Sequence, residues 1–176
     1  ASPNQIWVSD ITYIKSGQEF LYLFLITDAY SKKILGHRLA DTLDSIHAVN
    51  SLQDAIKNSS QPISGLIHHS DRGIQYCSKE YINVLKNNNL RISMTENSDP
   101  LENPVAERIN GVLKDEYLYQ YKYLTATELG KSIDAYNKTR PHLSCDMLTP
   151  DLAYLSSGKL KRRWKNYYKK SINLEV

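Results

Sequence analysis

The first forty residues alternate apolar segments with short polar turns, a pattern typical of β-strands. Three segments are rich in β-branched and aromatic residues: Ile6–Ile14, Phe20–Thr27 and Ile34–Ala40. The second is apolar at nearly every position, as expected for a strand that is covered on both faces in the middle of a sheet. Because the connecting turns are short, the pattern predicts three strands in an antiparallel meander.

After Ala40 the apolar positions recur every three or four residues, which predicts a helix over about 44–57. Further along, two short strands are expected at 66–69 and 91–94. Four more helices are expected to begin near 78, 103, 125 and 149; the second of these should run to about Tyr119, and the last should lead toward the C-terminal tail. Strands that cluster early and alternate with helices later predict an α/β fold with a mixed sheet and helices on its faces.

Composition limits the class of protein. With 176 residues, of which 41% are hydrophobic and 23% charged, the chain fits one compact domain and neither a disordered nor a fibrous protein. The longest apolar run, Phe20–Ile26, is too short to span a membrane, and the first residues lack the layout of a signal peptide. Cys77 and Cys145 are too few for a disulfide framework. We therefore expect a reduced, cytoplasmic protein that does not associate with membranes.

Positive charge is concentrated near the C-terminus. Seven basic residues and no acidic one lie within Lys159–Lys170, whereas residues 1–158 hold 15 Lys and Arg against 18 Asp and Glu. Trp164, Tyr167 and Tyr168 stand among these charges, so the segment offers both phosphate neutralisation and flat faces for stacking. A solvated, solubilising helix end is the alternative for such a run.

Two aspartates stand in positions that are costly for a carboxylate. Asp10 lies in the middle of an apolar strand, where Asp is depleted and where a charge needs a cation or several donors. Asp71 follows the strand at 66–69, and carboxyl ends of strands are where α/β sheets open a crevice for ligands. A bulge or edge position for Asp10 and a turn-capping role for Asp71 are the structural alternatives.

Glu107 lies in the first turn of the helix that begins at Asn103-Pro104, where the helix dipole alone would favour a negative charge. The helix nevertheless has two distinct sides. A buried side is expected from Val105, Ile109, Val112 and Leu113, and a polar stripe from Asn103, Glu107, Asn110, Gly111 and Lys114. Gly111 costs helix stability but leaves the stripe open beside Glu107, so a bulky backbone such as nucleic acid could approach there.

Asp10, Asp71 and Glu107 could converge on hard divalent cations. Ligation by oxygen alone favours Mg²⁺ or Mn²⁺ over zinc. Two such ions can activate the attacking oxygen and stabilise the leaving oxygen in phosphoryl transfer.

Four blocks of the sequence resemble those of bacterial insertion-sequence transposases of the DDE type, which are similar to retroviral integrases. Three are the catalytic blocks and one is a C-terminal signature: Trp7–Tyr13, His69–Tyr76, Asn103–Glu116, and Tyr136–Ser144 with Thr149-Pro150. Asp71 and Glu107 are separated by 35 residues, the spacing of this group. Many relatives have aromatic residues directly after the glutamate. In this chain Glu107 is followed by Arg108-Ile109-Asn110, which resembles one branch of the family.

The resemblance implies a ribonuclease-H-like fold, with a mixed five-stranded sheet and helices on both faces. It implies a catalytic core over residues 1–150, with a C-terminal helix and basic tail at 151–176, cut from a longer protein. It also implies that Asp10, Asp71 and Glu107 hold two Mg²⁺ or Mn²⁺ ions for DNA cleavage and strand transfer. The partner would be DNA, both the element ends and the target, and the protein would act on it as a homo-oligomer without a small-molecule cofactor. The expected location is the bacterial cytoplasm, in association with the nucleoid.

Several side chains are expected to contact DNA. Lys114, seven residues after Glu107, matches a DNA-contacting lysine of the family, and the others are Asn110, Arg72, Arg140, His142, Arg162, Arg163 and Lys165. A loop anchor between proline positions is the alternative for Arg140 and His142. His68 and His69 are adjacent on a strand and must point to opposite faces, so we expect a structural or DNA-positioning role and no catalytic one.

Two other functions remain open at this point. A nuclease of the same fold could act on RNA–DNA hybrids, and a domesticated transposase could bind DNA without chemistry. The intact set of three carboxylates argues against the second, because negative charge facing phosphates would only weaken a pure DNA-binding protein.

Overall fold

The computed structural model describes residues 2–96 and 103–163. Five strands form one sheet in the order β3-β2-β1-β4-β5. Their bounds are β1 Ile6–Ser16, β2 Glu19–Asp28, β3 Ile34–Ala40, β4 Ile67–Ser70 and β5 Arg91–Met94. The first three strands are antiparallel neighbours, whereas β4 pairs parallel to β1 and β5 parallel to β4. The predicted mixed five-stranded sheet is therefore confirmed, with β2 in an interior position.

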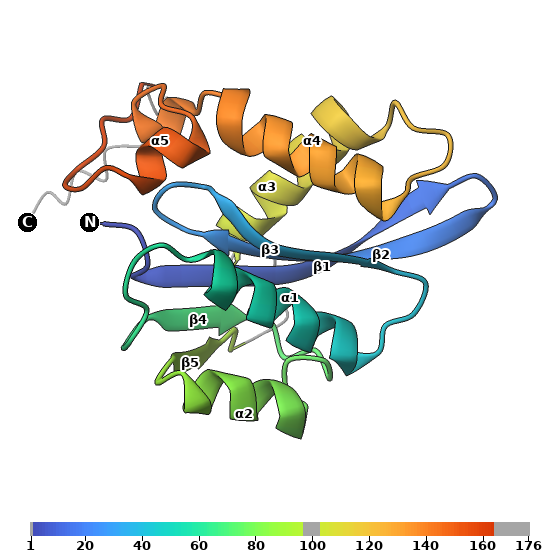
Figure 1. Cartoon of the computed structure of the whole chain (residues 1–176), viewed down its shortest axis with the longest axis horizontal. Coiled ribbons are helices and arrows are strands. Elements are labelled where there is room, and N and C mark those ends of the chain that lie inside the picture. The colour runs from blue at the N-terminus through green and yellow to red at the C-terminus, as the bar shows by residue number, and fades with distance from the viewer. Residues whose placement is uncertain (1, 97–102, 164–176) are drawn as a thin grey trace, which may run out of the picture.

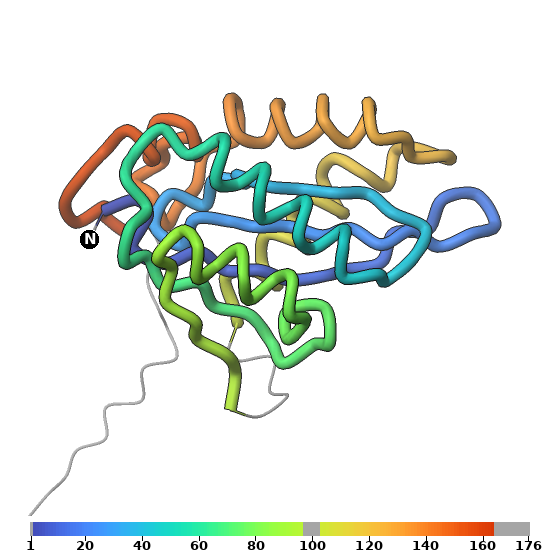
Figure 2. Tube along the Cα trace, turned by 60° about the horizontal axis from the view of Figure 1, so that its bottom comes forward, coloured from blue at the N-terminus to red at the C-terminus, as the bar shows by residue number. Residues whose placement is uncertain are grey.

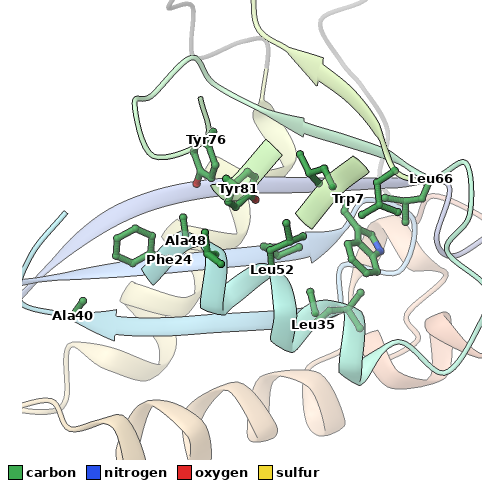
Figure 3. Close-up of a cluster of buried hydrophobic side chains, with 14 of the residues drawn as sticks. Trp7, Phe24, Leu35, Ala40, Ala48, Leu52, Leu66, Tyr76 and Tyr81 are labelled. Atoms are coloured by element: carbon green, nitrogen blue, oxygen red, sulfur yellow. The ribbon is translucent and has the colours of Figure 1, made fainter. Parts of the chain in front are cut away.

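Helices cover both faces of this sheet, as predicted (Figure 1). Their bounds are α1 Ser45–Asn58, α2 Lys79–Asn87, α3 Pro104–Leu113, α4 Ala126–Thr139 and α5 Pro150–Tyr154. Helices α1 and α2 contribute to one buried cluster, built around Trp7, Phe24 and Leu52 and shown in Figure 3. Helices α3 and α4 contribute to a second cluster on the opposite face, built around Leu23, Ile109 and Tyr136.

The helix starts follow the capping residues of the sequence. The Ser78 hydroxyl accepts a hydrogen bond from the Tyr81 N–H at the start of α2. At the start of α4, Thr125 and Glu128 form a reciprocal capping box. These local signals explain why the expected starts near 78 and 125 agree with the observed helices.

Two helix ends differ from the expectation. The α-helical bonding of α3 ends at Leu113 and continues as a π-helical turn over Lys114–Leu118, so the segment stays helical almost to Tyr119 with a changed pitch. The last helix does not lead into the basic tail, because α5 has only five residues. Tyr154, the last residue of the helix, is buried and donates to the Asn4 side chain at 2.9 Å, and Gly158 follows four residues later with a positive φ of 88°.

The β1–β2 hairpin extends past the rest of the sheet at the right of Figure 1, and Figure 2 shows its tip projecting beyond the helices. β1 pairs with β4 only through Ile6–Val8, whereas it pairs with β2 to its end. Among the described residues, the second half of β1 therefore has a strand partner on one side only. Over residues 2–96 and 103–163, no helix has the length and apolar character that crossing a membrane requires.

Candidate active site

The parallel pairing of β1 with β4 brings two of the candidate carboxylates to the same level. Val8 lies opposite His69, so continuing that register by two residues sets Asp10 beside Asp71. Asp71 comes directly after the last residue of β4, at the carboxyl end of the strand. The sheet topology thus places both aspartates where parallel strands open toward a ligand.

The Asp10 carboxylate is partly buried and held by two donors. Its Oδ1 atom accepts a hydrogen bond from the Ile11 N–H at 2.9 Å. Its Oδ2 atom accepts one from the Asn110 side-chain amide at 2.6 Å. Both bonds fix the orientation of the carboxylate on the face of β1 that α3 covers.

Asp71 is exposed and held by a tight turn. Its Oδ1 atom accepts a hydrogen bond from the Gly73 N–H at 2.9 Å. A Cβ atom at position 73 would lie 2.9 Å from that same oxygen and 3.1 Å from Oε1 of Gln75. A glycine is therefore required here for Asp71 to keep this rotamer.

Glu107 is brought to the site by α3, which is attached to β1 at two points. The Asn103 amide donates to the Ser9 carbonyl at 3.0 Å, and the Asn110 amide donates to Asp10 seven residues later. Two turns of helix separate these contacts, so Glu107 lies on the same side of α3, between them. Its side chain is exposed.

The electrostatics connect the three acids. The pKa of Asp10 is raised to about 6, mainly by burial and also by the negative charges of Asp71 and Glu107, against the lowering effect of the Ile11 and Asn110 hydrogen bonds. The fold therefore disfavours the ionised form of the Asp10 carboxyl group. A cation between the three carboxylates would relieve both the desolvation and the mutual repulsion.

The donor set fits a hard divalent cation, because it consists of carboxylate oxygens. Within residues 2–96 and 103–163, no three His, Cys, Asp or Glu side chains lie close enough together to hold a metal ion. The structure thus places Asp71 and Glu107 within electrostatic reach of Asp10, and the three do not form a closed ligand shell.

A buried network supports the strand residues next to Asp10. The Nε2 atom of His68 lies 2.7 Å from the Ser9 hydroxyl and 2.8 Å from the Tyr81 hydroxyl. Burial, together with the neighbouring His69, lowers the pKa of His68 to about 3, so the ring is neutral at physiological pH. His69 is half-buried and hydrogen-bonds the Ser93 hydroxyl through Nδ1 at 2.9 Å. The two histidines point to opposite faces, as the alternation of a strand requires.

The residues expected to contact DNA have different surroundings. Lys114 lies near the site, with its Nζ atom 5.2 Å from the centre of the Tyr13 ring. Arg72 is exposed and donates to the Thr95 carbonyl at 2.7 Å. Asn110, expected on the outer polar stripe, is buried and turned toward Asp10, whereas Ala106 takes the buried position expected of the half-buried Val105.

The remaining residues expected to contact DNA include two arginines that pair with acids other than the three candidate carboxylates. Arg140 forms a bidentate ion pair with Glu116 at 2.5 Å, and Arg163 pairs with Asp146 at 2.5 Å. His142 is buried, and burial together with Arg140 lowers its pKa to about 4. Arg162 is exposed on the rim of a cavity of about 730 Å³, and Lys165 lies outside the described residues. A neighbouring cavity of about 610 Å³ is lined by Arg108, Arg140 and His142 and by none of the three acids.

Sequence comparison places the chain among integrase cores. A family model described as an integrase core domain matches residues 1–100, and a second model with the same description matches residues 88–150. The chain is 32% identical to the transposase of insertion element IS629 of Shigella sonnei, over 78% of this chain and 47% of that protein. It is also 32% identical to transposase InsF of IS3A of Escherichia coli K12, over 86% of this chain and 54% of that protein. The chain thus spans about half the length of these curated relatives.

Structural comparison shows the same fold in retroviral integrases. The chain is similar to a chain of the simian T-cell lymphotropic virus intasome, with a TM-score of 0.78, 23% identity, and coverage of 97% of this chain and 61% of that one. It is also similar to the HTLV-2 integrase catalytic core domain solved with magnesium, with a TM-score of 0.69, 19% identity, and coverage of 87% and 97%. The expected ribonuclease-H-like fold is therefore confirmed.

Proposed function

Because this chain belongs to the integrase core domain family of bacterial insertion-sequence transposases, we propose that it is the catalytic core of a DDE transposase. Its substrate would be DNA, and its reaction metal-dependent cleavage at an element end followed by strand transfer. Asp10, Asp71 and Glu107 would hold two Mg²⁺ or Mn²⁺ ions. The observation that carries the proposal is the environment of the Asp10 carboxyl group. Burial and the charges of Asp71 and Glu107 raise its pKa to about 6.

The chain's own residues would prepare the site for the metal ions. Asn110 and the Ile11 N–H fix Asp10, the Gly73 N–H holds Asp71, and the exposed side chain of Glu107 would draw in toward a shared cation. When bound, the divalent ions would activate the attacking oxygen and stabilise the leaving 3′-oxygen. Lys114 would neutralise a phosphate beside the reacting group; burial lowers its pKa, and the nearby charges of Asp10 and Asp115 partly counteract this and favour the ammonium form.

Paired cleavage and joining events also suggest a homo-oligomer on DNA. A relative of the same fold is described in a dimeric form, and another within an intasome. We propose that two or more copies of the whole protein assemble on the element ends in the bacterial cytoplasm.

The test is a joining assay with Mn²⁺. DNA duplexes with random end sequences and free 3′-hydroxyls are incubated with a plasmid target, and joined products are sequenced. Asp71→Asn should abolish joining, and Asp41→Asn, an exposed aspartate after β3, should retain it. Joining by Asp71→Asn at the unmodified chain's rate would contradict the proposal.

Two further measurements, on an RNA–DNA hybrid and on DNA binding, separate the other functions. Digestion of an RNA–DNA hybrid without joining of DNA ends would indicate a nuclease of this fold. DNA binding with neither digestion nor joining would indicate a binding protein. In thermal unfolding at neutral pH, Mn²⁺ should raise the midpoint of the unmodified chain and leave that of Asp10→Asn unchanged.

A further inference from the structure

Two large aromatic side chains are exposed on the β1–β2 hairpin. Tyr13 is 64% exposed and Phe20 is 55% exposed, and their rings meet edge to face at 5.8 Å between centroids. Tyr13 lies opposite Tyr22 and Lys15 opposite Phe20, so all four side chains share one face of the hairpin. Apolar side chains that gather on one exposed face are a feature of binding surfaces.

Tyr13 lies on the opposite face of β1 from Asp10, and Lys114 connects this face to the candidate active site around the edge of the strand. The lysine Nζ lies 5.2 Å from the centre of the Tyr13 ring, and the Asp10 charge acts on the same ammonium group. Because β1 has no strand partner beside Tyr13 on the β4 side within the described residues, Lys114 can reach this ring from α3. The aromatic face therefore meets the candidate active site at this open edge of β1.

The hairpin holds these rings on a fixed support. The Gly17 N–H donates to the Lys122 carbonyl at 2.7 Å, and the Leu124 N–H donates to the Ser16 hydroxyl at 2.9 Å. The Tyr123 ring packs so closely on Gly17 that a Cβ atom there would lie 2.3 Å from it. The tip is thus anchored to the segment that precedes α4, although it projects beyond the helices in Figure 2.

Two lysines border this face, and the negative charges of Asp10 and Asp115 act on one of them, Lys114. Lys15 is exposed beside Phe20, and Lys114 stands beside Tyr13. Glu19 pairs with Ser16 and so points to the opposite face of the hairpin. Flat aromatic faces bordered by lysines match the chemistry of an unpaired nucleic-acid strand, whose bases stack and whose phosphates are anionic.

We propose that Tyr13, Phe20, Lys15 and Lys114 form a stacking surface for unpaired nucleotides of the DNA strand that leaves the candidate active site. This inference rests on the proposed function, because it takes DNA at the carboxylates as its starting point. Tyr13 and Phe20 would each stack one base, and the lysines would neutralise the phosphates between them.

The experiment measures binding without chemistry. The 176-residue chain is titrated in EDTA onto a fluorescent DNA duplex with a short unpaired tail and onto the same duplex with blunt ends. The unmodified chain should bind the tailed duplex more tightly. The double variant Tyr13→Ala with Phe20→Ala should bind the tailed duplex at least about 30-fold more weakly, since two stacked bases are lost, and should bind the blunt duplex with almost unchanged affinity.

Matched variants separate stacking from a general surface effect. Leu155→Ala removes a side chain that is 74% exposed far from the hairpin and should keep the preference for the tail. Tyr13→Phe retains the ring and should also keep it. In a second measurement, 5-iodouracil placed in the tail should crosslink to the peptides that contain Tyr13 or Phe20.

The outcomes are distinct from those for the proposed function. Equal loss of affinity for tailed and blunt DNA in the double variant, or an unchanged preference for the tail, would overturn the stacking surface. So would a shift in sedimentation of the double variant with unchanged DNA binding, because the face would then join two copies of the chain. If Asp71→Asn joins DNA normally while the tail preference depends on Tyr13, the catalytic proposal fails and the stacking surface stands.

Discussion

The side-chain amide of Asn110 donates to Oδ2 of Asp10 at 2.6 Å and so links α3 to the central strand across 100 residues of sequence. The bond lowers the pKa of Asp10 against the effects of burial and of the neighbouring acids. Asn110 is therefore a positioning residue for the carboxylate, which it both orients and keeps ionised.

Replacing Asn110 with alanine should reduce Mn²⁺-dependent joining by about 10- to 100-fold, the usual effect of losing a partner that orients a metal ligand. Without this donor the pKa of Asp10 rises above its value of about 6, so the acid limb of the pH–rate profile should move to higher pH. The measurement is the joining rate across pH 5–8. As a control, Asn103→Ala removes the neighbouring bond to the Ser9 carbonyl and should lower stability without moving the acid limb.

The Asp10 carboxylate should destabilise the folded protein at neutral pH. Its pKa rises from 3.8 to about 6 on folding, so the folded state binds more protons between these values and stability falls as the pH rises through this window. Asp10→Asn should therefore raise the free energy of unfolding at pH 7 by up to about 3 kcal/mol. The Asn110 amide can turn to suit the new side chain, because its Oδ1 atom is buried without a partner.

Urea unfolding of this variant at two pH values provides the check. The gain should be present at pH 7 and absent below about pH 3, where Asp10 is protonated in both states. Asp41→Asn changes an exposed aspartate and should alter stability little at either pH. A gain for Asp10→Asn that stays the same at both pH values would show that the carboxylate charge is not its cause.

Local signals in the sequence were enough to predict most of the fold. Alternation predicted β3 at its observed bounds, and the capping residues Ser78 and Thr125 predicted two helix starts. The early end of α5 was not predicted, and the contact of its last residue, Tyr154, with Asn4, 150 residues away, is likewise not evident from the local sequence.

The sequence was enough to predict the acidic residues of the candidate site, but not the residues that contact them. Asp10 and Asp71 are set side by side by parallel pairing of β1 with β4, which a list of elements does not reveal. From the sequence, Asn110 is expected to be one more polar residue on the stripe of α3. Only the contact between α3 and β1 shows that it faces Asp10. The exposure of Tyr13 likewise follows from where β4 stops pairing with β1.

Gly73→Ala should impair the reaction through Asp71. The new Cβ atom would lie 2.9 Å from Oδ1 of Asp71, so the carboxylate must swing away from its present position. A displacement of about 1 Å at a reacting group can reduce the rate by up to about 100-fold. The joining assay measures this loss, and Ile74→Ala, which trims a side chain that is 81% exposed in the same turn, should leave the rate unchanged. Full activity of Gly73→Ala would show that the rotamer of Asp71 does not matter.

Gly111 and Gly130 offer a matched pair that tests how closely DNA approaches α3. Each lies inside a helix, and a Cβ atom at either would meet nothing within 4 Å. Both alanine substitutions should therefore stabilise the fold by about 0.5–1 kcal/mol, because alanine has less conformational freedom to lose. Gly111 lies one helical turn after the exposed Glu107, so a methyl group there should also weaken binding to a DNA duplex, whereas Gly130→Ala should not. Equal DNA affinity for both variants would mean that the nucleic-acid backbone does not pass over the stripe.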